Sequence, residues 1–161
     1  MYPMMKHITW WPQLFLGLTF NWGALLGWTA QTNVLELPAI LLYAGCITWT
    51  IGYDTIYAHQ DKEDDQRIGI KSTALLLGHH SLYWITGFYS LSMILWLLAC
   101  LLSGFGIGFG GSLCAVAIMF YHQLRHWNPD DPHDCLERFR TNRLVGWVLL
   151  IGLLIDNALI D

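Results

Sequence analysis

The sequence has little charge: only 12% of its 161 residues are Asp, Glu, Lys or Arg. A soluble domain usually carries about 25%. With 55% hydrophobic residues, nine Trp and a mean hydropathy of +0.41, this shortage indicates an integral membrane protein in contact with the lipid bilayer. The net charge of −4 leaves no cluster of cations to meet phosphates, so we expect no nucleic-acid partner.

Cysteine motifs and a leader sequence are also missing. None of the four cysteines forms a CxxC pair, and three of them fall inside apolar runs. We interpret them as small buried hydrophobes rather than as a disulfide framework or a zinc site. The first ten residues lack the basic stretch followed by an apolar stretch that marks a cleavable signal peptide. We expect one membrane domain over residues 1–161.

Long apolar runs are what the sequence does have. A helix that crosses the hydrocarbon core needs about 20 mostly apolar residues. Five runs come close to this length: 10–29, 37–58, 82–102, 106–124 and 144–160. The predicted fold class is therefore all-α and integral membrane, with about five transmembrane helices.

The few cations are distributed unevenly. All eight fall in segments that five spans would place on one side of the membrane. They are Lys6, Lys62, Arg67, Lys71, Arg125, Arg138, Arg140 and Arg143. Because cytoplasmic loops carry an excess of Lys and Arg, we predict that this side is cytoplasmic, and we expect a bacterial inner membrane.

An acidic segment, YDTIYAHQDKEDDQRIGIKS at residues 53–72, follows the second apolar run directly. Its centre, DKEDD at 61–65, places four acids in five positions, where they repel one another. A hard divalent cation relieves that repulsion, and Mg²⁺ prefers one or two carboxylates together with waters and substrate phosphates. Arg67 and Lys71 follow the acids. The combination predicts a Mg²⁺–diphosphate site on the cytoplasmic face, with these two cations as diphosphate contacts.

Helical spacing adds a residue to this site. If the second helix continues through the segment, Asp54, Tyr57, Asp61 and Asp65 share one face about 80° wide. Asp61 and Asp65 are then one turn apart and can converge on one ion, while Asp54 lies about 10 Å of helix rise earlier. An acid at the edge of a membrane span is costly and usually functional. The alternative is a solvated acidic loop.

Two other polar features have simpler interpretations. His122 and His126 have a spacing that zinc ligands can use, but interfacial histidines at a helix end share it. Asp156 is expected to be a helix-end residue with access to the membrane interface.

The segment YDTIYAHQDKEDDQRIGIKSTALLLG resembles the second aspartate-rich motif of the UbiA-type membrane prenyltransferases, and most closely those that act on 4-hydroxybenzoate in ubiquinone biosynthesis. The stretches YPMMKHITWWPQLFLGLTFNWG and CLERFRTNRLVGWVLLIGL resemble other parts of the same enzymes. The resemblance implies transfer of a polyprenyl group from polyprenyl diphosphate to an aromatic acid acceptor, with Mg²⁺ as cofactor.

The resemblance also implies roles for individual acids. It assigns Mg²⁺ binding to Asp61 and Asp65 first, with Asp64 as a further metal ligand and Asp54 as a further catalytic acid. The mechanism it implies passes through a cation-like allylic carbon. Nearby aromatic rings such as Tyr53 would shield that carbon by cation–π contact, although ordinary packing explains such rings equally well.

One family element is missing from the sequence. The family's first aspartate-rich motif, NDxxDxxxD, has no counterpart here. We therefore expect this chain to be the C-terminal half of a nine-helix bundle, inactive without a complementary N-terminal half. Two other interpretations stay open: a non-catalytic membrane protein that binds or conducts divalent cations, and the remnant of a gene.

Overall fold

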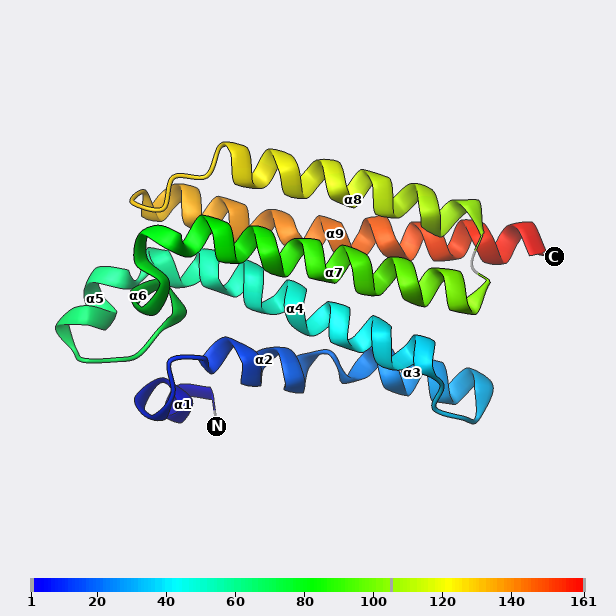
Figure 1. The fold of residues 1–161 in the computed structure, drawn as a ribbon, viewed down its shortest axis with the longest axis horizontal. Helices are drawn as coiled ribbons and strands as arrows, with labels where there is room; N and C mark the ends of the chain where they lie inside the picture. Colours follow the sequence, from blue (N-terminus) through cyan, green and yellow to red (C-terminus); the bar gives the residue numbers. More distant parts are fainter. Residues whose placement is uncertain (1, 105, 161) are drawn as a thin grey trace.

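The structure, a computed structural model, describes residues 2–104 and 106–160, and throughout these residues the regular structure is helical. The elements are α1 (Tyr2–Ile8), α2 (Pro12–Phe20), α3 (Trp22–Thr32), α4 (Leu37–Gln60), α5 (Lys62–Arg67), α6 (Thr73–Leu77), a 3₁₀ turn (Gly78–His80), α7 (Ser81–Ser103), α8 (Ile107–Arg125) and α9 (Pro132–Ile160). Within the described ranges, four helices are long and apolar enough to cross a membrane, namely α4, α7, α8 and α9. They lie side by side along one axis (Figure 1). The all-α membrane class is confirmed.

The predicted first span is not one helix. Residues 12–32 form two short helices, α2 and α3, which meet at Asn21 and run along α4 (Figure 1). The Asn21 side-chain amide donates to the Gly17 carbonyl, at 2.7 Å, and to the Thr50 hydroxyl of α4, at 2.9 Å. An Asn that bonds the carbonyl four residues earlier competes with the helix's own hydrogen bonds, which accounts for the break.

The last span begins earlier than predicted. The apolar run starts at residue 144, but α9 starts at Pro132, a residue well suited to the first turn of a helix. Asp134 lies in that first turn, where it complements the helix dipole, and its carboxylate pairs with Arg138 at 3.0 Å. Polar residues therefore extend α9 beyond its membrane-spanning part.

Helices α4 and α7 pack closely because glycines on α4 receive large side chains of α7. A Cβ at Gly45 would lie 2.5 Å from Trp96, and one at Gly52 would lie 2.5 Å from Tyr89. The two glycines are seven residues apart and so occupy one face of the helix. Small residues that admit close packing are typical of helix interfaces in membranes.

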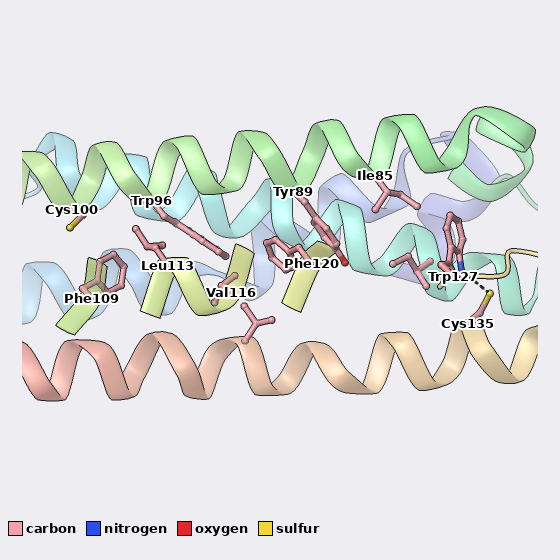
Figure 2. Close-up of a cluster of buried hydrophobic side chains, with 12 residues drawn as sticks. Ile85, Tyr89, Trp96, Cys100, Phe109, Leu113, Val116, Phe120, Trp127 and Cys135 are labelled. Atoms are coloured by element: carbon pink, nitrogen blue, oxygen red, sulfur yellow. Dashed lines mark hydrogen bonds between the residues drawn. The ribbon is translucent and has the colours of Figure 1, made fainter. Parts of the chain in front are cut away.

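The core fills the space between α7, α8 and α9 (Figure 2). Its centre is the stacked pair of Tyr89 and Phe120, whose ring centroids are 4.0 Å apart. The opposite surfaces of the same helices carry exposed apolar side chains, including Leu97 on α7, Ile118 on α8 and Trp147 on α9. This distribution suits helices whose outer faces meet lipid.

Asp156 is buried rather than interfacial, with 3% of its surface exposed. Its two carboxylate oxygens accept the backbone N–H groups of Gly106, Gly108 and Phe109 at 2.7–2.9 Å. An acid from α9 therefore caps the N-terminus of α8, where the helix dipole favours negative charge. The expectation of interfacial access is wrong.

Candidate functional site

The acidic segment lies at the end of the bundle that also holds α1, α5, α6 and the α8–α9 loop (Figure 1). The Lys71 N–H donates to the Lys6 carbonyl at 2.9 Å, and the Lys71 ammonium donates to the Ile8 carbonyl at 3.2 Å. On the other side of α4, the rings of His59 and Trp127 meet edge to face at 5.0 Å. The three cation-bearing segments are thus gathered at one end, as their distribution in the sequence predicted.

The helix does not continue unbroken through the acids. α4 ends at Gln60, Asp61 has φ −100° and ψ 8°, and α5 begins at Lys62. One helical hydrogen bond spans the break, from the Asp65 N–H to the Asp61 carbonyl at 2.8 Å. Asp61 and Asp65 therefore remain one turn apart, whereas Asp54 is buried on the separate helix α4.

Asp65 is the most unusual acid of the segment. Only 4% of the residue is exposed, one carboxylate oxygen lies 3.7 Å from the Lys6 ammonium, and the other has no hydrogen-bond partner in the described part of the chain. Burial raises the pKa of this carboxyl; the Lys6 charge opposes that rise, and the neighbouring Asp61 adds to it. A buried acceptor without a partner needs an explanation, and a bound cation is one that fits a carboxylate.

Lys6 is a residue that the sequence did not single out. It lies far from Asp65 along the chain, and only the fold brings the two together through the contact between α1 and the turn after α5. The signal that was available is indirect: Lys6 stands in the segment YPMMK, which is part of the family resemblance.

Two predicted residues face away from Asp65. Arg67 pairs with Glu63 at 3.5 Å and with Asp64 at 3.4 Å, and all three side chains are largely exposed. The structure therefore does not bring Asp64 or Arg67 to the Asp65 carboxylate. Lys71 is less exposed than Arg67 and less buried than Asp65. It is half-buried and hydrogen-bonded to the α1–α2 connection, and its ammonium lies 5.9 Å from the centre of the Trp10 ring.

An aromatic pocket of about 340 Å³ lies on α4 and α9 and is lined by Trp49, Tyr53, Phe139, Arg140, Asn142 and Arg143. Phe139 of α9, which the sequence did not single out, contacts Tyr53 at 5.6 Å and Tyr57 at 4.7 Å between ring centroids. The Trp49 indole donates to the Asn142 side-chain oxygen at 3.0 Å. The pocket combines aromatic faces with two guanidinium groups, which suits an aromatic anion.

The described residues contain no group of three or more His, Cys, Asp and Glu arranged to hold a metal ion. His122 and His126 stack with ring centroids 6.4 Å apart and are exposed. Asp61 and Asp65 suit Mg²⁺ better, because Mg²⁺ takes one or two carboxylates and completes its shell with water and phosphate oxygens. The oxygen of Asp65 without a partner fits that use.

Comparison with known proteins identifies the family of the chain. The family model of the UbiA prenyltransferase family matches residues 1–153. The chain is 45% identical over 157 residues to the mitochondrial 4-hydroxybenzoate polyprenyltransferase of Bos taurus, covering 97% of this chain and 42% of that protein. It is 42% identical over 158 residues to the enzyme of the same name from Arabidopsis thaliana, covering 98% of this chain and 39% of that protein. No solved structure matches the chain.

The chain thus spans about two fifths of the length of these relatives. Both relatives are named as mitochondrial proteins. Their names give no support to the bacterial inner membrane that we expected, whereas the long apolar helices do support an integral membrane protein.

Proposed function

This chain belongs to the UbiA prenyltransferase family, and from that premise we propose that it forms part of an enzyme that transfers a polyprenyl group from polyprenyl diphosphate to an aromatic acid. We take the acceptor to be 4-hydroxybenzoate, in ubiquinone biosynthesis, because the relatives carry that name. The observation that carries the proposal is Asp65: a buried carboxylate with one unpartnered oxygen, a turn after Asp61 and beside Lys6.

In this proposal, Asp61 and Asp65 would hold the Mg²⁺ that accompanies the diphosphate. The bound ion would supply positive charge to the diphosphate oxygens as they leave the allylic carbon. Lys6 adds a second positive charge next to Asp65, and Lys71 holds the α1–α2 connection in place through the Ile8 carbonyl. Asp54, buried at the inner end of α4, is the further catalytic acid.

Asp64 and Arg67 have weaker support. Both lie on the exposed side of α5 and already pair with each other. A role for Asp64 as a metal ligand or for Arg67 as a diphosphate contact requires α5 to turn toward the substrate. We keep both as proposals to be tested against Asp65.

The reaction breaks the bond between the allylic carbon and the diphosphate oxygen. It forms a bond from that carbon to the ring carbon ortho to the phenol, and the ring then loses a proton to water. The diphosphate leaves with the bonding electron pair, so the main task of the protein is to stabilise its charge. The aromatic pocket supports a second task, because Tyr53 and Phe139 offer their faces to the developing carbocation.

The membrane explains the placement of the site. The prenyl tail is apolar and can lie between helices in the hydrocarbon, while the diphosphate meets the acids at the cation-rich end of the bundle. By the positive-inside rule this end faces the cytoplasm or, in a mitochondrion, the matrix.

We propose further that two carboxylates of this chain hold the metal weakly on their own. A complementary segment carrying NDxxDxxxD would supply acids from the opposite side of the diphosphate. No observation in the described residues favours the non-catalytic alternative, a protein that binds or conducts divalent cations.

The test is a prenyl-transfer assay in membranes. Radiolabelled 4-hydroxybenzoate, polyprenyl diphosphate and Mg²⁺ are supplied to membranes holding this chain, alone or with a segment of a relative that contains NDxxDxxxD. Product is expected only with both, and Asp65→Asn should remove it. Turnover by this chain alone would refute the need for the complementary segment, and full activity of Asp65→Asn would refute the role of the acid.

A further inference from the structure

A groove of about 640 Å³ runs between α7 and α8, and no acidic residue of the described chain lines it. Its lining within the described residues comes from these two helices alone, and its outer edges are exposed, with Leu82 at 43%, Ile94 at 55% and Tyr121 at 57% exposure. The floor is the buried stacked pair of Tyr89 and Phe120. The groove is therefore a channel with a closed floor on the outer surface of the described helices.

The length of the groove matches one leaflet. Its wall on α7 extends from Leu82, at the cation-rich end, to Ile94. At 1.5 Å per residue this is about 18 Å, compared with about 15 Å for half of the hydrocarbon core. The groove therefore begins near the inner interface and ends near the middle of the membrane.

Its inner mouth carries a cation. Arg125, the last residue of α8, lines the groove and donates one hydrogen bond, to the Tyr121 hydroxyl at 2.9 Å. It forms no ion pair with a carboxylate in the described part of the chain, and the guanidinium has five N–H donors. Most of these donors are free to meet a phosphate, which a guanidinium can bind with two parallel hydrogen bonds.

The walls beyond the mouth are mostly apolar, with the hydroxyls of Thr86 and Ser90 as their polar groups. Met93 and Ile94 continue the groove from α7 and Ala117 from α8. The Thr86 hydroxyl donates to the Leu82 carbonyl of its own helix, at 2.7 Å, and so places no unpaired polar group in the groove. One cation at the interface followed by an apolar channel one leaflet deep is complementary to a phosphodiester with an acyl chain.

We propose that this groove binds one glycerophospholipid of the cation-rich leaflet, with its phosphate on Arg125 and an acyl chain over Tyr89 and Phe120. Basic pockets between membrane helices on the cytoplasmic or matrix side are known to bind lipid head groups. The polyprenyl substrate is not the occupant, because a diphosphate on Arg125 would lie on α8 rather than at Asp61 and Asp65. This exclusion of the polyprenyl substrate rests on the proposed function.

The experiment uses vesicles that contain the full chain and a phosphatidylglycerol with a photoreactive diazirine in one acyl chain. Mapping of the labelled peptides is expected to place the probe on residues 82–94 and 117–125. Arg125→Gln should lower labelling about tenfold, the loss of one charge-assisted contact. The matched control is Arg140→Gln, which removes an exposed arginine at the same end of the bundle but outside the groove.

A second pair of variants tests the channel itself. Ala117→Trp should fill the groove and remove labelling, whereas Ile118→Trp places the same ring on the adjacent exposed position, outside the groove, and should not. The proposal is overturned if Arg125→Gln and Ala117→Trp are both labelled to the same extent as the wild type. It is equally overturned if unlabelled polyprenyl diphosphate displaces the probe and excess phosphatidylglycerol does not.

Discussion

Two buried carboxylates stand at opposite ends of the bundle, and their surroundings differ. Asp156 has both oxygens filled by three backbone N–H groups of the α8 N-terminus. Asp65 is buried to the same degree, but one oxygen has a lysine at 3.7 Å and the other has no partner in the described chain. A carboxylate whose bonds are complete serves the fold, and one left incomplete at a cost to stability is available for a ligand.

The largest expected effect separates the two acids by activity. On the proposed function, Asp65→Asn should lower prenyl transfer about 10²- to 10³-fold, since it removes a carboxylate that would hold the Mg²⁺ that stabilises the departing diphosphate. Asp156→Asn keeps an oxygen that accepts from the α8 N-terminus and should retain most activity. Initial rates are compared in membranes that also hold the complementary segment carrying NDxxDxxxD, with equal amounts of each folded variant. Equal losses of activity in the two variants would contradict the distinction between the acids.

Substitutions at Asp156 should lower the free energy of unfolding, whereas the substitution at Asp65 should not. Asp156→Ala leaves three N–H groups without an acceptor at a buried helix end, which should cost about 2 kcal/mol of unfolding free energy. Asp65→Asn removes a buried charge that is incompletely paired and should leave stability unchanged or raise it. Denaturant titration in detergent micelles, followed by circular dichroism of the helices, measures the unfolding free energy of each variant. A lower unfolding free energy for Asp65→Asn than for the wild type would contradict the view that the buried Asp65 charge costs stability.

The sequence predicted Asp65 as a metal ligand and Asp156 as a helix-end residue, but it did not show the side-chain partners of either acid. Those partners are distant along the chain: Gly106 and Gly108 for Asp156, and Lys6 for Asp65. Hydrophobic runs predicted α4, α7 and α8 well, since length and apolarity decide a membrane span.

Where the sequence misled, a polar interaction decided the outcome. Asn21 breaks the first span by bonding the Gly17 carbonyl of its own helix, and it also donates to Thr50 of α4. The first turns of α9 are polar and are stabilised by an ion pair between Asp134 and Arg138. A prediction based on apolar residues alone therefore starts this helix too late. Asp61 and Asp65 were correctly placed one turn apart because one helical hydrogen bond survives the break between α4 and α5.

The pH dependence of stability sharpens the comparison further. The pKa of Asp65 is raised above its ordinary value in the folded chain, chiefly by burial, so the folded state holds this proton more tightly than the unfolded state does. The stability linked to this proton is fully present below the ordinary pKa and is lost as pH rises through the raised one. Unfolding measured across the acid range should show this fall.

Two variants test that assignment. Asp65→Asn should remove this component of the pH dependence. Lys6→Gln should widen its range, because the Lys6 charge is what opposes the rise in pKa. An unchanged profile in both variants would show that another group is responsible.

The smallest expected effect concerns the exposed side of α5. Arg67→Gln breaks two ion pairs between solvent-exposed groups and should change the unfolding free energy by less than about 0.5 kcal/mol. If Arg67 contacts the diphosphate as the sequence predicted, the KM for polyprenyl diphosphate should rise while stability stays constant. Equal KM values in Arg67→Gln and the unmodified protein would remove Arg67 from the site.

The break at Asn21 also has a consequence for biogenesis. With nine and eleven residues, α2 and α3 are each well short of the roughly 20 needed to cross a bilayer. Their junction holds an amide whose partner, Thr50, is synthesised later. We therefore expect residues 12–32 to enter the lipid together with α4, as a helical hairpin.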